Sequence, residues 1–256
     1  MNTTNTKKLG LIQTRGLGDI IIALPIAHHY HQEGWHVHWP ITAQWVPQMQ
    51  RVAPWVTWLP VEPDNGAFFY DTPMQMLIDL GIVDHLCLYQ ALTGHPEFTE
   101  MPYFQHTSFD QYKYICAGVP FLNKWRLAEC LTRNSGREWA LYNQVAPKDG
   151  TPYVVTHLTA SQHTVTYDPA IIPEGWAVVP ITGQGDLFDW LTVVERAEAV
   201  IMTDSSMANL VDQLGINVER YFIPIHHIGL TPVQGQHWTW LDNPQLPPTS
   251  RIFRGN

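Results

Sequence analysis

The chain has 256 residues, of which 45% are hydrophobic and only 14% are charged, and this composition excludes a disordered or coiled-coil protein. Its formal net charge of -9 argues against general binding of nucleic acids, because neutralising phosphates requires clustered cations. The length allows one large domain or two compact ones.

Three cysteines, none of them in a CxxC pair, favour a reducing compartment. Residues 1–6 are polar with no apolar core after them, unlike a signal peptide, and the longest apolar stretch, 20–27, is too short to cross a bilayer. We therefore expect a cytoplasmic protein without a membrane span.

The amino-terminal residues predict a βαβ unit. A strand at 8–13 and a turn at 14–19 precede a helix over 20–33, which Gly34 ends, and a second strand follows at 35–40. Such a unit implies a parallel sheet.

Further helices are expected at 72–80 and 110–118, with a long loop at 93–107 between them. A second α/β series begins near residue 150. Its expected elements are strands at 152–157, 176–181 and 199–203, helices at 187–197 and 207–214, and a last strand at 221–224. We therefore expect two α/β domains, residues 1–140 and 141–256.

The first candidate site is the glycine turn that contains Gly16, Gly18 and Asp19. It is not a complete dinucleotide fingerprint, because the third glycine would fall at Ile21, and it is not a P-loop. Two interpretations of Asp19 stay open. It is either an ordinary helix N-cap or a general base at the carboxyl edge of a parallel sheet.

The second candidate is the segment 203–209, which joins a strand to a helix. Its hydroxyls and free backbone N–H groups suit a diphosphate at the positive end of the helix, and they equally suit a helix cap at Ser205 or Ser206. The loops 157–166 and 182–186 also follow strands of this half and should reach the same sheet edge, where His157 is either a nucleotide ligand or a structural histidine.

The stretch 111–137 is locally basic, and its cations are either a phosphate-binding patch or an ordinary solvated face. They are Lys113, Lys124, Arg126, Arg133 and Arg137, against Glu129 alone. The histidines at 28, 29, 31, 36, 38, 226 and 227 lack the spacing of a metal motif, so we expect no metal. Trp238 and Trp240 alternate like strand residues and suit either packing or stacking on a sugar.

Taken together and in order, these segments resemble glycosyltransferase family 9, the ADP-heptose:lipopolysaccharide heptosyltransferases and their relatives. Gly16–Pro25 looks like the family's opening turn, aspartate and proline-containing helix. Val154–Ser161 is similar to its strand with a histidine, 182–186 to its glycine-rich loop, and Glu195–Gly215 to its Asp-Ser/Thr-Gly stretch.

The resemblance implies two facing Rossmann-like domains of the GT-B type with parallel sheets, and a metal-independent, inverting transfer without a cofactor. Asp19 would be the general base, and the second domain would bind most of the nucleotide-sugar donor. The implied donor-binding residues are Gly16, Gly18, His157, Thr159, Thr182, Gly183, Gly185, Asp204, Ser205, Ser206 and Asn209.

The sequence also departs from the family. Ser206 and Asn209 stand where relatives usually have Gly and His, and 160–166 lacks the usual cation for the phosphates. The donor could carry a hexose, heptose or pentose, and the acceptor is a glycan or lipopolysaccharide, or a hydroxymethylated base of viral DNA. One alternative is a non-catalytic nucleotide-sugar or carbohydrate-binding protein of the same fold. Another, a dinucleotide enzyme, is disfavoured because no acidic residue ends the second strand.

Overall fold

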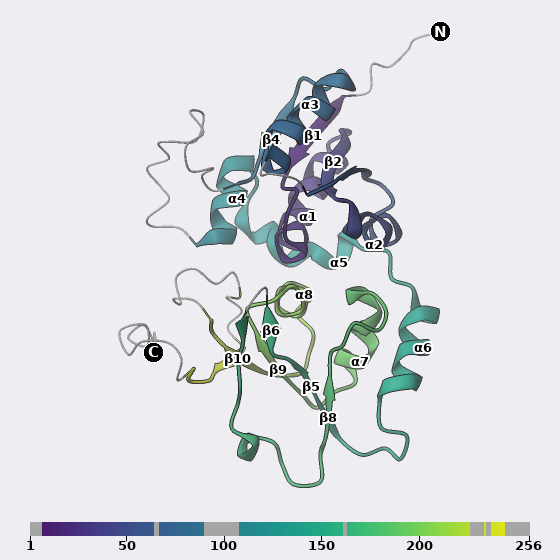
Figure 1. Ribbon diagram of the computed structural model, residues 1–256, viewed down its shortest axis with the longest axis vertical. Helices are drawn as coiled ribbons and strands as arrows, with labels where there is room; N and C mark the ends of the chain where they lie inside the picture. Colours follow the sequence, from purple (N-terminus) through teal and green to yellow (C-terminus); the bar gives the residue numbers. More distant parts are fainter. Residues whose placement is uncertain are drawn as a thin grey trace. The chain divides into compact units, whose positions relative to one another are not determined.

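The computed structural model describes residues 7–63, 67–89, 108–160, 163–225, 233 and 237–243. The chain divides into two compact units, Met1–Thr132 and Arg133–Asn256, and each of them is an α/β unit with a parallel sheet (Figure 1). The expected α/β class with two Rossmann-like domains is therefore confirmed. The loop expected at 93–107 lies outside the described residues.

The first unit is built on a four-stranded sheet in the order β3-β2-β1-β4, and all its strand pairs are parallel. Its strands are β1 (Lys8–Ile12), β2 (His36–Thr42), β3 (Thr57–Val61) and β4 (His85–Cys87). In this register Leu9 lies opposite Val37, and Leu11 lies opposite Leu86. Because the strands are parallel, the segments that follow all four of them begin at one edge of the sheet.

Five α-helices accompany this sheet in the described part of the unit. They are α1 (Leu17–Gln32), α2 (Val46–Val52), α3 (Asp71–Asp79), α4 (Phe109–Ala117) and α5 (Leu127–Cys130), with 3-10 turns η1 (Ala43–Trp45), η2 (Ala67–Phe69) and η3 (Phe121–Arg126). Helix α1 begins at Leu17, before the expected start at Ile20, and contains Pro25. Its residues 20–27 are buried, which explains why this segment is apolar on all sides.

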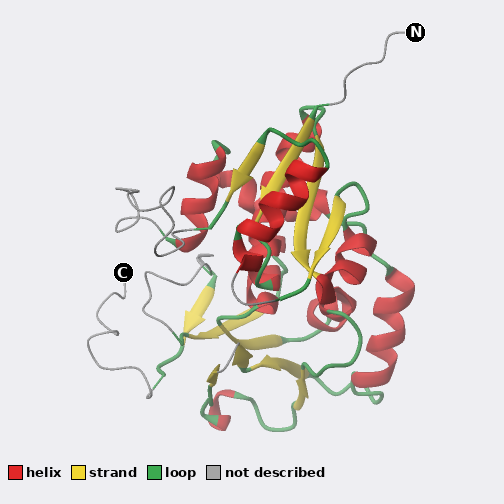
Figure 2. Cartoon of the chain, turned by 45° about the horizontal axis from the view of Figure 1, so that its top comes forward, coloured by secondary structure: helices red, strands yellow, loops and turns green. Residues whose placement is uncertain are grey.

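The second unit has a five-stranded parallel sheet in the order β11-β10-β9-β5-β8. Its strands are β5 (Tyr153–His157), β8 (Ala177–Pro180), β9 (Ala199–Thr203), β10 (Glu219–Ile223) and β11 (Trp238–Trp240). The expectation that the strand near 221–224 is the last one is wrong, because β11 pairs with β10 through Arg220 and Trp238. A small antiparallel pair, β6 (Thr159–Ala160) and β7 (His163–Thr164), stands apart from this sheet. Figure 2 shows the strands of the two units in yellow.

The helices of the second unit flank the strands that carry the candidate residues. They are α6 (Ser135–Val145), η4 (Pro169–Ile171), η5 (Leu187–Trp190), α7 (Leu191–Glu195) and α8 (Ser206–Leu214). The expected helix at 187–197 is thus a 3-10 turn followed by a short α-helix. Gly215, with φ of 60°, ends α8 as the sequence predicts. Helix α6 belongs to the second unit, and the boundary expected at 140/141 falls inside it.

No helix among the described residues is long and apolar enough to cross a membrane.

Candidate functional site

The turn after β1 brings Gly16 and Asp19 into direct contact. Gly16 occupies the N-cap position of α1 with φ of 81° and makes no side-chain cap, while Asp19 lies in the first turn of the helix. A Cβ atom on Gly16 would lie 2.4 Å from Oδ2 of Asp19. Asp19 is therefore not the N-cap residue, and its carboxylate lies over a position that only glycine can occupy.

The carboxylate of Asp19 is three-quarters shielded, with 25% of the side chain exposed, and it has one close cation. The Nζ atom of Lys113 lies 3.2 Å from Oδ1. This contact is an ion pair. Burial raises the pKa of Asp19, and Lys113 and Arg15 oppose that rise without cancelling it.

Lys113 itself is one of the most deeply buried side chains of the first unit, with 1% exposed. From α4 it donates to Oε1 of Gln13 at 2.5 Å and to the carbonyl of Leu88 at 3.2 Å. It was not among the predicted site residues, because in the sequence it is one cation in a basic stretch and its partners lie far away along the chain.

The backbone N–H groups at the start of the turn are already occupied. The Tyr89 hydroxyl accepts hydrogen bonds from the N–H groups of Thr14, at 2.9 Å, and Arg15, at 2.8 Å, and lies 2.7 Å from Oγ1 of Thr14. Burial raises the pKa of Tyr89 to about 12, so the phenol stays protonated. These two N–H groups therefore hold a tyrosine, where a dinucleotide enzyme would use such a turn for its phosphates.

In the second unit, the structure brings together two predicted residues from neighbouring strands. His157 ends β5, Ser205 follows β9, and Nδ1 of His157 lies 2.8 Å from Oγ of Ser205. The same Oγ accepts the N–H of Ala208 at 3.2 Å, so Ser205 is the N-cap of α8. Burial lowers the pKa of His157, which keeps its ring neutral at neutral pH.

The other predicted residues near α8 differ in how far they are exposed. Asp204 and Ser206 are half-buried at the junction of β9 and α8. Asn209 is buried, its Nδ2 donates to the carbonyl of Ser205 at 3.0 Å, and its Oδ1 has no hydrogen-bond partner among the described residues. Ser206 thus presents a hydroxyl at the helix start that the cap does not use, whereas Ser205 is engaged by its neighbours.

The glycine loop 182–186 follows β8, which is the other neighbour of β5. Thr182, Gly183 and Gly185 are exposed. Two side chains from the following turn hold the loop: Asp189 accepts the N–H of Asp186 at 2.9 Å, and Trp190 donates to the carbonyl of Gln184 at 3.0 Å. The carboxyl edge of this sheet therefore carries His157, Ser205 and the start of this loop. Thr159 is also exposed, in the small β6–β7 pair.

The basic stretch 111–137 is not a free cationic patch, because each of its cations has a carboxylate partner. The ion pairs are Lys113–Asp19, Lys124–Asp110, Arg126–Glu129, Arg133 with Glu138 and Glu195, and Arg137 with Asp186 and Asp189. Lys124 and Asp110 are both fully buried, at 2.7 Å. These cations are therefore engaged in ion pairs within the protein.

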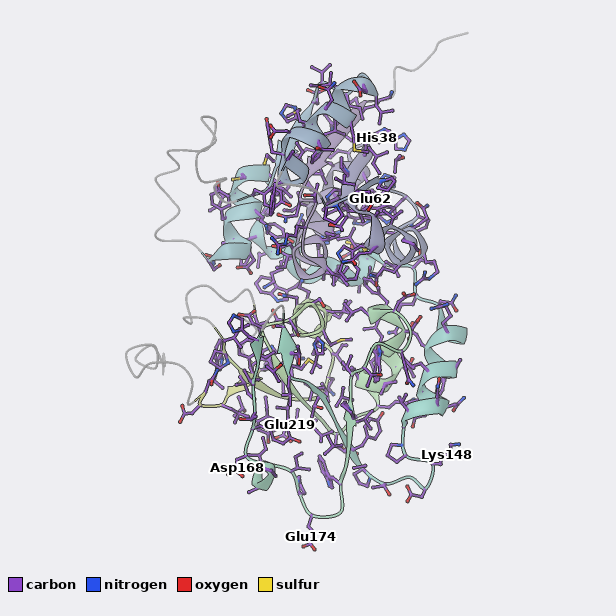
Figure 3. The ribbon with its side chains drawn as sticks, in the orientation of Figure 1. His38, Glu62, Lys148, Asp168, Glu174 and Glu219 are labelled. Carbon is purple, nitrogen blue, oxygen red and sulfur yellow. The ribbon has the colours of Figure 1, made fainter. Side chains whose placement is uncertain are left out.

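Among the described residues, no group of three or more His, Cys, Asp or Glu side chains is arranged to hold a metal ion. His38 lies buried on β2 with its ring centroid 4.7 Å from that of His36 (Figure 3). His226 and His227 lie outside the described residues. Trp238 is buried and donates to Asp212 at 2.9 Å, so it is a packing residue.

No protein-family model matches the chain, and no curated protein matches it in sequence. Solved structures do match. A glycosyl transferase family 9 protein from Veillonella parvula is 12% identical with a TM-score of 0.64, over 96% of this chain and 90% of that one. The dodecameric iron-containing heptosyltransferase TibC, solved with ADP-D-β-D-heptose, is 11% identical with a TM-score of 0.55, over 93% of this chain and 63% of TibC. This chain therefore spans less than two thirds of TibC.

These likenesses confirm the expected resemblance to glycosyltransferase family 9 at the level of the fold. They extend over nearly the whole chain, so both Rossmann-like units take part in the match.

Proposed function

We propose that the chain is a glycosyltransferase that moves a sugar from a nucleotide-sugar donor to an acceptor hydroxyl with inversion and without a metal. The observation that carries the proposal is the carboxylate of Asp19. It is partly exposed at the carboxyl edge of a parallel sheet, where open α/β folds place their sites, and it is paired with the buried Lys113. The fold shared with family 9 glycosyltransferases supports the same function.

In this reaction Asp19 takes the proton of the acceptor hydroxyl while the hydroxyl oxygen attacks the anomeric carbon. The bond from that carbon to the diphosphate breaks, and the nucleoside diphosphate leaves with the bonding electrons. A raised pKa suits the role, because a base works best when its pKa lies near the working pH.

The donor is assigned to the second unit. Ser206 and Asp204 stand at the start of α8, where a diphosphate meets the positive end of the helix. His157 and Ser205 position that helix start by binding each other, and the exposed Thr182, Gly183 and Gly185 offer a surface for the nucleoside. The complex of TibC with ADP-heptose makes an adenine nucleotide sugar the first donor to test.

A glycan, such as a lipopolysaccharide sugar, is the acceptor that we favour. A DNA acceptor would need cations for its phosphates, and the cations of 111–137 are all paired with carboxylates. A sugar acceptor has no such requirement. A cytoplasmic enzyme would act on such an acceptor before the acceptor is exported.

The test is Asp19→Asn, assayed in excess EDTA with ADP-D-β-D-heptose and a panel of other nucleotide sugars, by release of the nucleoside diphosphate. The amide keeps the shape but cannot take a proton, so turnover should fall by at least about a hundred-fold while donor binding is unchanged. Asp71→Asn is the matched control, because Asp71 is an exposed carboxylate in the first turn of α3. Wild-type turnover in Asp19→Asn would remove Asp19 from the mechanism.

A non-catalytic binding protein is the second candidate, and it is favoured by the absence of a Lys or Arg in 160–166. It predicts that one nucleotide sugar raises the melting temperature while the wild-type protein releases no nucleoside diphosphate with any acceptor. Release that depends on Asp19 would exclude it.

A further inference from the structure

We propose that Lys113 is the positioning residue of the proposed catalytic carboxylate: it fixes the orientation of Asp19 and keeps the carboxylate of Asp19 ionised. The inference rests on the proposed role of Asp19 as the base. It concerns a side chain that neither the glycine turn nor the likeness to solved structures singles out.

The geometry of Lys113 is that of a fixed cation. Its ammonium contacts Gln13 just after β1, Leu88 just after β4 and Asp19 in the first turn of α1, at 2.5, 3.2 and 3.2 Å. A lysine ammonium has three N–H groups, and these acceptors come from three different segments of the unit. With 1% of the side chain exposed, Lys113 cannot swing out to water without leaving these acceptors, so it holds the carboxylate from one side.

Burying the charged side chain of Lys113 has an energetic cost, and the ion pair with Asp19 offsets part of that cost. Taking a lysine out of water is unfavourable unless it is paired, and burial lowers the pKa of Lys113 accordingly. The neutral partners Gln13 and Leu88 would be served equally well by an uncharged donor. Of these three contacts, the one with Asp19 is the one that a positive charge strengthens.

The charge balance around Asp19 defines what Lys113 does. Burial favours the protonated carboxyl, and the cations that oppose it are Lys113, in contact, and Arg15, which is exposed and screened by water. Tyr89 faces Asp19 as a neutral phenol, and the thiols of Cys87 and Cys116 lie near Lys113. Without Lys113, burial acts almost unopposed, and a protonated carboxyl cannot serve as a base.

The experiment is the pH profile of turnover in Lys113→Met. Because the variant raises the pKa of Asp19, its acid limb should move to higher pH by at least about one unit, with turnover down about tenfold at neutral pH and recovering in alkaline buffer. Lys113→Arg keeps the charge and should keep a profile near that of the wild type. Asp19→Asn should not recover at any pH.

The matched control is Lys124→Met, which breaks the other buried lysine–aspartate pair of the same unit. Lys124 and Asp110 are fully buried and pair with each other at 2.7 Å. Both variants should lower the melting temperature, but only Lys113→Met should move the acid limb. If Lys113→Met does not fold, Lys113→Gln removes the charge while keeping a donor for the Leu88 carbonyl.

A measurement without any substrate separates this inference from the proposed function. In protein with 13C-labelled aspartate, the carboxyl resonance of Asp19 should titrate at higher pH in Lys113→Met than in the wild type. A shifted titration in a protein without transferase activity would support Lys113 and sink the proposed function. An unshifted titration would overturn the role of Lys113, whatever the enzyme does.

Discussion

At Gly16 two constraints fall on one residue. Its φ of 81° is a backbone conformation that residues with a Cβ atom rarely adopt. In addition, the carboxylate of Asp19 lies in the space that a Cβ atom on Gly16 would need. Gly118 shares the first constraint only. It ends α4 with φ of 64°, and no atom lies within 4 Å of the position that a Cβ atom would take. Comparing Gly16 with Gly118 therefore separates the effect of backbone strain from the effect of the position of the Asp19 carboxylate.

We predict that Gly16→Ala and Gly118→Ala both lower the free energy of unfolding by about 1–2 kcal/mol, because both force an alanine to positive φ. Only Gly16→Ala should also reduce turnover, by at least about tenfold, since it displaces Asp19 from its contact with Lys113. Thermal unfolding and steady-state kinetics measure the two effects. Equal turnover in the two variants would show that the position of the carboxylate does not matter.

Single residues were predictable where a local pattern marks them, and not where a distant partner does. Gly16 and Asp19 stand in one turn, and His157 and Ser205 each end or follow a recognisable strand, so the sequence pointed to them. The pairing of Lys113 with Asp19 joins α4 to α1, two helices that lie far apart in the sequence. Nothing local distinguishes Lys113 from the other cations of 111–137, which also turned out to be paired.

At the scale of elements, α6 is tied to the rest of the second unit by two arginines that do different things. Arg137 binds Asp189 through two hydrogen bonds, at 2.9 and 2.6 Å, and Asp189 in turn accepts the N–H of Asp186 in the glycine loop. Arg133 binds Glu138 and Glu195 and does not reach the loop. The loop proposed to bind the nucleoside is therefore supported by Arg137 of α6, both through Asp189 and through its own contact with Asp186 at 3.0 Å.

From this arrangement we predict that Arg137→Ala loosens the loop 182–186. Removing the guanidinium leaves the carboxylate of Asp189, which is 8% exposed, without its cation, although Arg137 is itself 44% exposed and the pair is partly screened. Amide hydrogen exchange in the loop should speed up about fivefold. Arg133→Ala is the control and should leave the loop unchanged. Equal exchange in both variants would mean that Trp190 alone holds it.

Sequence patterns did not predict β3, β4, β11, α2 or α6, and for two of these strands the reason is their length. Strands β4 and β11 have three residues each, too few for a periodic pattern. The helix expected at 187–197 begins as a 3-10 turn, because Asp186 and Asp189 form a reciprocal cap that tightens its first turn. By contrast β1, β5 and β9 were predicted because most of their five residues are buried and apolar, and α8 was predicted because it has a recognisable start and stop.

At the scale of the whole molecule, the two units carry different chemistry at equivalent places. The carboxyl edge of the first sheet presents a carboxylate with its own buried cation. The carboxyl edge of the second presents hydroxyls, a neutral imidazole and glycines. If the second unit binds the diphosphate as proposed, these groups predict that N–H and O–H donors hold it, since the cations of 111–137 are paired with carboxylates.

This division of chemistry predicts where ADP binds. With saturating ADP, amide exchange should slow at the ends of β5 and β9, at the start of α8 and in the loop 182–186. The turn after β1 should be unaffected, because Tyr89 already occupies the N–H groups of Thr14 and Arg15. Adenosine, which lacks phosphates, should protect the loop without protecting the start of α8.

The salt dependence of ADP binding provides a second test of the same prediction. Phosphates held by backbone N–H groups and a helix end release few bound counterions, so the dissociation constant for ADP should change by less than about tenfold between 50 and 500 mM salt. A steep dependence would point to a free cation that binds the phosphates. Protection of the turn after β1 would move the donor to the first unit and leave Ser206 and Asp204 without their assigned role.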